Sequence, residues 1–190
     1  MANIIILEGL SRSGKTSLTN ALVERHGYRC ISIKDKMPEY VKNLSDFYHG
    51  MHVITNEFFR TFKDETFVID RSFLSEMVYS RFFDRPSYIT QGEVINDLLF
   101  DNNFILVYLS NRYSNYVERK PKDKFVYTEQ DFTKQKDLFE WFFDSHKKHF
   151  ENQDWQDRFI RISSVENTIE QSLELIENKI NTYFNVNQTV

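Results

Sequence analysis

The feature that most constrains this chain is a short glycine-containing segment near its N-terminus. Residues 9–16, Gly9-Leu10-Ser11-Arg12-Ser13-Gly14-Lys15-Thr16, fit the pattern G-x-x-x-x-G-K-[ST] at every fixed position. The glycines let the backbone curl so that consecutive N–H groups point inward, where they can bind phosphate oxygens. An apolar strand pattern precedes the segment and an amphipathic helix pattern follows it. We therefore predict a strand, a phosphate-binding loop and a helix in this order.

The polar positions of this loop have expected partners on a bound nucleoside triphosphate. Lys15 would reach the β- and γ-phosphates, Thr16 would offer its hydroxyl to Mg²⁺, and the helix start would add its positive end. We predict ATP and Mg²⁺ as the cofactors. The residues expected to bind them are Gly9, Ser11, Arg12, Ser13, Gly14, Lys15, Thr16 and Ser17.

Composition limits the other possibilities. A chain of 190 residues with 41% hydrophobic residues suits one folded domain, which we place at 1–190. The formal net charge of −4 gives no general attraction to nucleic acid or to an anionic membrane. No signal-peptide pattern or membrane-length apolar run is present, so we expect a cytoplasmic protein with no membrane partner. Cys30 is the only cysteine, which excludes an internal disulfide, and its strand context predicts a small buried side chain.

Short β-branched runs alternate along the chain with longer helical patterns. This alternation predicts an α/β fold of the P-loop NTPase type, a five-stranded parallel sheet flanked by helices. The strands are expected at about 3–8, 29–34, 66–70, 103–109 and 158–162. Helices are expected at about 15–26, in the 40–62 region, after Asp70, and at about 91–101, 111–119, 129–150 and 166–183.

Two of the helical regions carry apolar stripes at three- and four-residue spacing. We expect both stripes to lie in the core rather than at a ligand. Ser45-Asp46 could divide the first region into two helices. The first stripe is Tyr40, Leu44, Phe47, Met51, Ile54, Phe58 and Phe62, and the second is Phe132, Phe139, Phe143 and Phe150.

A second candidate site segment follows the third predicted strand, which ends in Asp70-Arg71-Ser72. At the carboxyl end of a strand beside the loop, Asp70 would hold Mg²⁺ through water and Arg71 would face the phosphoryl acceptor. A helix-capping role is the alternative for this segment, and Ser72 could cap equally well. The D-x-x-G and N-K-x-D motifs of switch GTPases are absent from the sequence.

With the loop, these residues resemble the thymidylate kinases and the neighbouring deoxynucleoside kinases. The resemblance covers roughly residues 3–83. Arg12 matches the thymidylate-kinase type that carries an arginine inside the loop, which implies a place for Arg12 on the donor phosphates. Lys36-Met37-Pro38-Glu39 resembles the Arg-Phe-Pro-Glu segment of that family. Residues 70–75 resemble its Asp-Arg-Tyr-x-x-Ser, and equally the Glu-Arg-Ser of deoxynucleoside kinases.

The sequence departs from the thymidylate-kinase pattern at positions that contact the acceptor. Ser11 stands where that family has an aspartate, and Tyr40 where it has an arginine. Asn56 lies four residues before Arg60, where that family places an aromatic residue, so specificity for thymidylate does not carry over. The candidate acceptor-binding residues are Lys36, Asn56, Arg60, Arg71 and Tyr79.

The densest cationic stretch of the chain follows the fourth predicted strand. In nucleotide kinases this part of the topology is a lid that closes over the phosphates, and we place the lid at about 117–127. A solvated surface loop is the alternative. Arg119 is the best single candidate because a guanidinium can bind two phosphate oxygens. The candidate catalytic residues are Lys15, Arg12, Asp70, Arg71 and Arg119.

Three functions remain open from the sequence. The favoured one is ATP-dependent phosphoryl transfer to a (deoxy)nucleoside monophosphate, which is already anionic and needs no obligatory base. The second is a kinase of a hydroxyl group, on a deoxynucleoside or on a nucleic-acid end or modified base, with Asp35 or Asp70 as the base. The third is a nucleotide-binding regulator without turnover. The expected partner is a small nucleotide or nucleoside, nucleic acid is not favoured, and a homodimer is possible.

Overall fold

The computed structural model describes residues 1–32, 44–87, 102–119, 126–149 and 155–184. Its centre is one five-stranded sheet in the order β2-β3-β1-β4-β5, with every neighbouring pair parallel. This confirms the predicted fold class and the order of strands and helices around the loop. The strands are β1 (Asn3–Gly9), β2 (Arg29–Ser32), β3 (Thr66–Asp70), β4 (Asn103–Ser110) and β5 (Phe159–Ser163).

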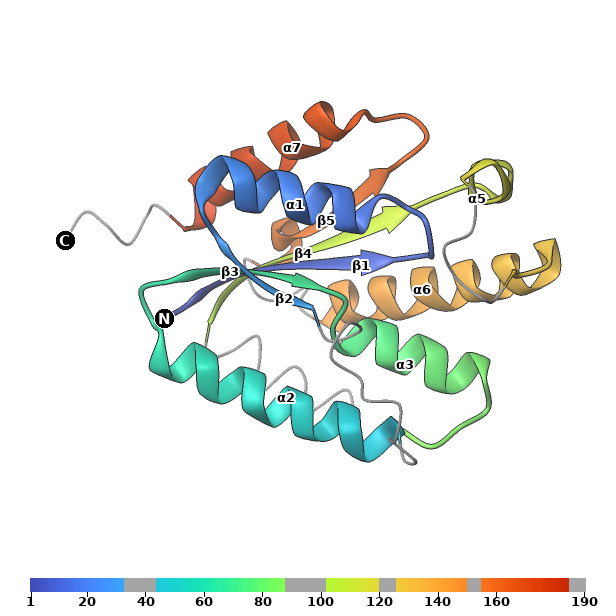
Figure 1. Cartoon of the computed structure of the whole chain (residues 1–190), viewed down its shortest axis with the longest axis horizontal. Coiled ribbons are helices and arrows are strands. Elements are labelled where there is room, and N and C mark those ends of the chain that lie inside the picture. The colour runs from blue at the N-terminus through green and yellow to red at the C-terminus, as the bar shows by residue number, and fades with distance from the viewer. Residues whose placement is uncertain (33–43, 88–101, 120–125, 150–154, 185–190) are drawn as a thin grey trace.

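Helices cover both faces of the sheet (Figure 1). On one face lie α1 (Lys15–His26) and α7 (Ile169–Tyr183), and on the other lie α2 (Leu44–Thr61), α3 (Phe73–Phe82) and α6 (Glu129–His149). The short helix α5 (Tyr113–Glu118) follows β4, and the 3₁₀ turn η3 (Gln156–Arg158) leads into β5. Within the described ranges, no helix combines the length and the apolar character that crossing a bilayer requires.

The alternation of side chains along β1 divides the core into two parts. Ile4 and Ile6 belong to the cluster under α3 and α6, whereas Ile5 and Leu7 belong to the cluster under α1 and α7. All four side chains are fully buried, as expected for a central parallel strand covered on both faces. Glu8 is the next residue on the same face of the strand as Ile4 and Ile6. Its carboxylate therefore lies on the α3 side of the core.

The prediction that Cys30 is buried is wrong, because its side chain is exposed. β2 is the edge strand of the sheet and pairs only with β3. Arg29 and Cys30 are both exposed on it, and Ile31 is half-buried. The sequence pattern predicts a strand here but does not say which strands lie at the edges of the sheet.

The predicted core role of the apolar stripe in the 40–62 region is wrong for its described C-terminal part. Ile54 is 52% exposed, Phe58 49% and Phe62 37%. The buried face of α2 instead carries His52, Thr55, Asn56 and Phe59. Phe59 packs edge-on against Phe67 of β3, with 5.1 Å between ring centroids, and the polar residues bond within the helix. The helix face that turns inward is therefore not the one with the apolar stripe. α2 begins at Leu44 and includes Ser45-Asp46, and the part of this region before Leu44 lies outside the described residues.

The second stripe behaves as predicted where the structure describes it. Phe132, Phe139 and Phe143 of α6 are buried in the cluster beneath β1 and β4. Phe139 stacks on Tyr108 of β4 at 5.9 Å between centroids. The expected helix at 91–101, most of the lid at 120–125, and Phe150 lie outside the described residues.

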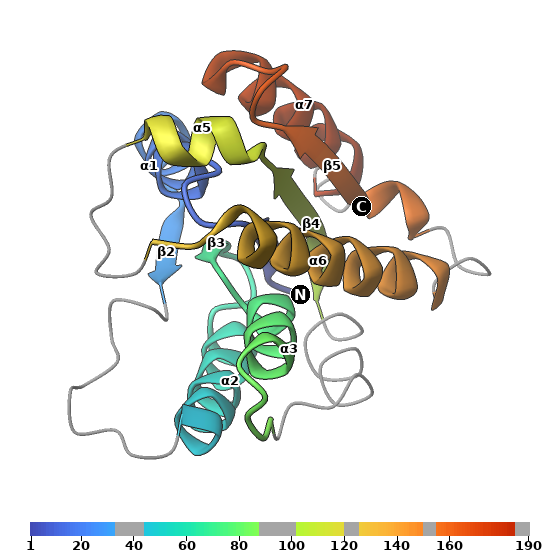
Figure 2. The same ribbon diagram turned by 90° about the vertical axis from the view of Figure 1, so that its right-hand side faces the viewer.

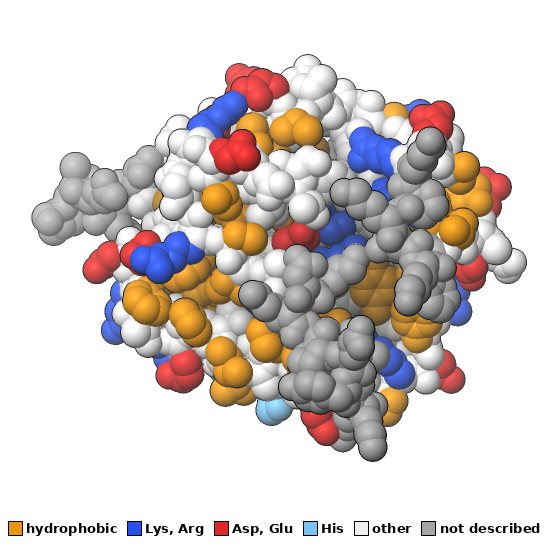
Figure 3. All heavy atoms as spheres, in the orientation of Figure 1, with side chains coloured by type: hydrophobic (Ala, Val, Ile, Leu, Met, Phe, Trp, Pro, Cys, Tyr) orange, Lys and Arg blue, Asp and Glu red, His pale blue; other side chains and the backbone are white. Residues whose placement is uncertain are grey.

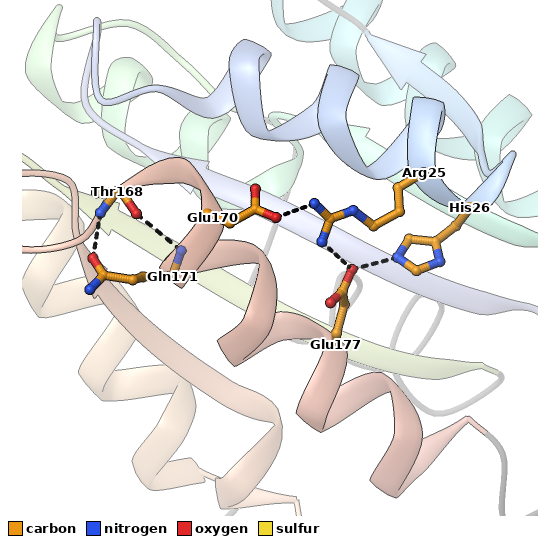
Figure 4. A network of polar contacts seen from close by, with 6 residues as sticks. All are labelled: Arg25, His26, Thr168, Glu170, Gln171 and Glu177. Atoms are coloured by element: carbon orange, nitrogen blue, oxygen red, sulfur yellow. Dashed lines mark hydrogen bonds and ion pairs between the residues drawn. The ribbon is translucent and has the colours of Figure 1, made fainter.

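An exposed ion-pair network joins the two helices that cover the α1–α7 face (Figure 4). Arg25 donates to both Glu170 and Glu177, and His26 Nε2 lies 2.8 Å from Glu177 Oε1. At the start of α7, Thr168 and Gln171 form a reciprocal capping box. The network therefore ties the end of α1 to a well-capped α7.

We expect Glu177→Gln to lower the free energy of unfolding by about 0.5 kcal/mol at neutral pH, the size typical of exposed ion pairs. Burial acts to raise the pKa of the Glu177 carboxyl, but the hydrogen bonds from His26 and Arg25 outweigh it and the pKa is lowered. A lowered pKa gives stability that is present above the unfolded value of about 4.3 and is lost as the pH falls through the folded pKa. Urea unfolding of Glu177→Gln at several pH values measures this. The difference from wild type should shrink in acid, and a difference independent of pH would contradict the account. Glu174→Gln, on an exposed turn of the same helix, is the matched control.

Candidate active site

The phosphate-binding loop joins the end of β1 to the start of α1 at the carboxyl edge of the sheet. Figure 2 looks onto this edge, where α5 lies beside the start of α1. Gly9 has φ of 135°, and a Cβ atom there would lie 2.2 Å from the carbonyl oxygen of Leu109, so only glycine fits between the strands. Gly14, with φ of 93°, precedes α1 and places no side chain on its first amides. These helical N–H groups can therefore face a phosphate.

Lys15 directs its ammonium group into the loop. Its Nζ donates to the carbonyl oxygens of Gly9 and Leu10 at 2.9 and 2.5 Å and to Ser13 Oγ at 3.2 Å. The side chain is buried. The positive charge thus lies inside the curve of the loop, where a triphosphate would bind.

Thr16 and Asp70 meet across the edge of the sheet. The register of β1 with β3 places Asp70 opposite Leu7, and Thr16 Oγ1 donates to Asp70 Oδ2 at 3.0 Å. The other carboxylate oxygen, Asp70 Oδ1, is buried without a hydrogen-bond partner. A buried, unpaired carboxylate oxygen beside a hydroxyl fits a hydrated Mg²⁺, which binds through one or two carboxylates and retains several waters. These two residues would hold the metal predicted from the sequence.

We expect Asp70→Asn to raise the Mg²⁺ concentration needed for half-maximal rate and to lower kcat, each by about 10-fold or more, because a neutral amide holds hydrated Mg²⁺ poorly. Rates measured against free Mg²⁺ test this. Ser72→Ala is the control, because the Ser72 side chain makes no capping hydrogen bond to α3. An unchanged Mg²⁺ titration and kcat in Asp70→Asn would leave Asp70 a structural role only.

Residues after β4 bind the back of the loop. Arg119 Nη1 donates to the carbonyl oxygen of Arg12 at 2.6 Å, and Asn111 Nδ2 donates to the same atom at 3.2 Å. The Arg12 side chain turns toward α5, where its guanidinium stacks over Tyr116 at 4.1 Å and Nη1 donates to the Tyr116 carbonyl oxygen at 2.6 Å. Arg119 therefore lies over the loop itself, whereas Arg12 is held at its outer side. Asn111 and Tyr116 were not predicted from the sequence.

A cavity of about 210 Å³ opens beside the loop. The first residues of α1, Arg119 and the β5–α7 turn surround it. Its polar lining offers hydroxyls and an amide, and Ile169 adds an apolar wall. The lining residues are Ser13, Gly14, Ser17, Leu18, Leu109, Arg119, Ser164, Asn167, Ile169 and Ser172. Ser17 was predicted from the loop, whereas the contribution of the β5–α7 turn was not.

Arg71 contacts the first residue of the loop, Gly9. The Arg71 backbone N–H donates to the Leu7 carbonyl oxygen at 3.1 Å, and its Nη1 lies 3.0 Å from Tyr79 Oη and 3.4 Å from both the Gly9 carbonyl oxygen and Ser75 Oγ. Burial acts to lower the pKa of Arg71, but Tyr79 and Glu8 outweigh it and the pKa is raised. The guanidinium therefore keeps its charge beside the loop. The structure brings together Arg71 and Tyr79, both expected at the acceptor, and their role in binding an acceptor stays a prediction.

Further polar residues that the sequence did not indicate lie near Arg71. Glu76 is buried and forms two hydrogen bonds of 2.6 Å with Arg85, whose guanidinium lies 5.8 Å from the centre of the Tyr48 ring. Burial raises the pKa of Tyr48, and the Glu76 charge adds to this effect. Only the folded structure unites these residues, which come from α2, α3 and the turn after α3.

The remaining predicted acceptor residues do not join this cluster in the described structure. Arg60 contacts Glu57 at 2.7 Å and is exposed. Asn56 is buried within α2, 3.3 Å from His52 Nε2. Lys36, together with Asp35 and Glu39, lies outside the described residues. Ser11 of the loop is half-buried.

No protein-family model and no curated protein matches this sequence. Solved structures do match it, over 94% of the chain. One is a deoxyadenosine kinase from M. mycoides with the products dCMP and dCDP, at 17% identity over 99% of that chain and a TM-score of 0.62. Another is the YorR protein of Bacillus subtilis in complex with phosphorylated GDP, at 17% identity over 95% of that chain and a TM-score of 0.65. A third is the thymidylate kinase of Candida albicans, at 19% identity over 91% of that chain and a TM-score of 0.60.

These similarities show the fold. The chain has the fold of the P-loop nucleotide kinases, which confirms the resemblance inferred from the loop and from residues 70–75. At identities of 17–19% the comparisons describe architecture, and the chemistry is argued from the site.

Proposed function

We propose that this protein transfers the γ-phosphoryl group of ATP to a (deoxy)nucleoside monophosphate. One observation supports the proposal: cations from three different elements converge on the same loop. Lys15 and Arg71 both donate to the Gly9 carbonyl oxygen, at 2.9 and 3.4 Å, and Arg119 donates to the Arg12 carbonyl oxygen at 2.6 Å. Phosphoryl transfer between two anionic groups requires such an arrangement, because charge must be neutralised on the donor and on the acceptor.

The donor half is supported by the loop and its neighbours. The backbone of the loop and the start of α1 would bind the phosphates, with Lys15 on the β- and γ-phosphates. The cavity lined by Ser164, Asn167 and Ile169 would take the remainder of the nucleotide. Thr16 and Asp70 would hold Mg²⁺, which when bound neutralises charge on the phosphates. Arg119 is proposed to act on the same phosphates, and Arg12 would join it only after leaving its contacts with Tyr116.

The acceptor half rests on Arg71. Its guanidinium, oriented by Tyr79, would bind the acceptor phosphate so that one of its anionic oxygens faces the γ-phosphorus. That oxygen forms the new P–O bond while the bond to the β-phosphate oxygen breaks, and ADP leaves with the electron pair. Because the attacking oxygen is already anionic, correct positioning is sufficient and no proton has to be removed.

A second candidate is transfer to a hydroxyl group of a nucleoside. The deoxyadenosine kinase with a similar fold raises it, and the unpaired Asp70 Oδ1 is a carboxylate oxygen that could accept a proton. This chemistry requires a base. Asp35, the other candidate base, lies outside the described residues.

Incubation with γ-labelled ATP and a panel of nucleosides, nucleoside monophosphates and oligonucleotides tests the proposal. Transfer of label to monophosphates alone, which gives labelled nucleoside diphosphates, supports the first candidate. Transfer of label to nucleosides, which gives labelled monophosphates, supports the second. Saturable nucleotide binding with label on none of them would instead support a regulator without turnover. A small nucleotide substrate, a cytoplasmic location and a homodimer are part of the same proposal, and sedimentation velocity measures the oligomeric state.

A further inference from the structure

Glu8 is the one charged residue of β1 and is fully buried. It directly precedes Gly9 and projects to the same side of the sheet as Ile4 and Ile6, toward α3. Burial raises the pKa of its carboxyl, and the hydrogen bonds it accepts oppose this rise. A buried carboxylate is costly unless its oxygens are hydrogen-bonded, so its partners indicate its role.

Among the described residues, the hydrogen bonds to the Glu8 carboxylate come from the N-cap and the first turn of α3. Oε1 accepts from the backbone N–H groups of Ser72 at 2.8 Å and Ser75 at 3.2 Å, and Oε2 accepts from the Ser75 hydroxyl. Ser72, at the N-cap position of α3, makes no side-chain capping bond of its own. Glu8 therefore caps α3 from a different strand, and its negative charge meets the positive end of the helix.

This cap fixes the turn that carries Asp70 and Arg71. Arg71 has φ of 69°, an uncommon value for a residue other than glycine, so the surrounding contacts must hold it. The Arg71 N–H bonds to the Leu7 carbonyl oxygen on one side of the turn, and Glu8 binds Ser72 and Ser75 on the other. Two consecutive residues of β1 thus hold the turn from both ends.

The same contacts reach the Arg71 side chain. Ser75 Oγ, which donates to Glu8, also lies 3.4 Å from Arg71 Nη1, and the Glu8 charge helps raise the pKa of Arg71. A short chain of contacts therefore links the residue before the phosphate-binding loop to the proposed acceptor arginine.

We propose that Glu8 is a positioning residue that sets Arg71 relative to the phosphate-binding loop by capping α3 from β1. This inference rests on the proposed function for its kinetic consequences only. The placement of Arg71 by Glu8 holds whatever the acceptor is.

Glu8→Gln tests the proposal with little change in shape. The amide oxygen can still accept from Ser72 and Ser75, but the negative charge is lost and the amide NH₂ group replaces the acceptor of the Ser75 hydroxyl. We expect the acceptor KM to rise and kcat to fall, together costing about 10- to 100-fold in kcat/KM, the size of effect that a small misplacement produces. The donor dissociation constant should stay within about threefold, because Lys15 and Arg119 are not contacted by Glu8.

Asn3→Ala is the matched control. Asn3 lies at the opposite end of β1 and bonds to Thr66 and Asn103 on the neighbouring strands. The Asn3→Ala variant should have a lower melting temperature than wild type and an unchanged kcat/KM. If Glu8→Gln behaves like Asn3→Ala, with lower stability and unchanged kinetics, Glu8 is only structural and the proposal fails. If Glu8→Gln does not fold, Ser75→Ala removes the hydroxyl shared by Glu8 and Arg71 and takes its place with the same expectations.

A double-mutant cycle separates positioning from independent effects. Glu8→Gln combined with Arg71→Ala should be no worse in kcat/KM than Arg71→Ala alone, because Glu8 acts through Arg71. Additive losses would overturn the proposal.

The closing measurement needs no substrate. In protein with ¹⁵N-labelled arginine, the Arg71 Nε–H resonance is the one missing from Arg71→Lys. We expect Glu8→Gln to shift this resonance and to speed its hydrogen exchange, whereas Asn3→Ala leaves it unchanged. An unaltered resonance in Glu8→Gln contradicts the positioning role. A shifted resonance in a protein that labels no acceptor would keep that role and reject the proposed function.

Discussion

Replacing Lys15 with alanine should lower the rate of phosphoryl transfer by about 10²- to 10⁴-fold, which corresponds to a few kcal/mol of transition-state stabilisation. The Lys15 ammonium lies among the carbonyl oxygens of Gly9 and Leu10 and the Ser13 hydroxyl, at the centre of the loop. Nothing else in the described loop places a cation inside this curve, since Arg12 is held against Tyr116. The variant therefore loses the charge that would meet the γ-phosphoryl group.

The Lys15→Ala measurement needs a stability control. The Lys15 side chain packs within the loop rather than in the main core, and its removal leaves polar space that a water molecule can occupy, so the melting temperature should change little. Lys136→Ala, on an exposed part of α6, should leave the rate unchanged. A rate within about tenfold of wild type, with an unchanged melting temperature, would refute the role of the loop.

Replacing Arg71 with alanine should raise the acceptor KM by about 100-fold, the value of a hydrogen bond to a charged group. Arg71 is held by Tyr79, Ser75 and the Gly9 carbonyl oxygen, and it keeps its charge. A dianionic acceptor phosphate is present in the ground state as well as in the transition state. The loss should therefore appear mainly in the acceptor KM rather than in kcat.

The comparison that completes this experiment uses Asp35, a candidate base, and Glu39, a second carboxylate close to it in the sequence. For a monophosphate acceptor, Asp35→Asn and Glu39→Gln should have little effect. A hydroxyl acceptor reverses the pattern: one of these variants would abolish kcat, the rate would fall in acid, and Arg71→Ala would leave the acceptor KM untouched. That result would replace the monophosphate kinase by the hydroxyl kinase.

The parts of the fold that the sequence predicts well are those set by local pattern. The strand before Gly9, the glycine-punctuated loop and the helix from Lys15 were all expected, since each is fixed by residues close in sequence. α2 shows the limit of this approach. Two of its faces have helical spacing, and the face that turns inward carries His52 and Asn56, which contact each other, and Phe59, which packs on Phe67. Periodicity identifies a helix but does not choose between two such faces.

The candidate site likewise contains some residues that local sequence patterns identify and others that only the tertiary structure brings together. Lys15, Thr16 and Asp70 belong to short motifs whose chemistry fixes their spacing, so the sequence could name them. Arg85 meets Glu76, and Asn111 meets Arg12, only through the tertiary structure. The position of Glu8 is visible in the sequence, because a single carboxylate at the end of an otherwise apolar central strand requires buried partners. Its partners, 64 and 67 residues away, were beyond the reach of any local pattern.

The most direct test of the central claim is the fate of the γ-phosphoryl group of ATP. The protein is incubated with γ-labelled ATP, Mg²⁺ and equimolar mixtures of deoxynucleosides and their monophosphates, with Lys15→Ala in parallel, and the products are separated by chromatography. We predict label in a nucleoside diphosphate with wild-type protein and almost none with Lys15→Ala. Label in a nucleoside monophosphate, or equal labelling by both proteins, would contradict the account.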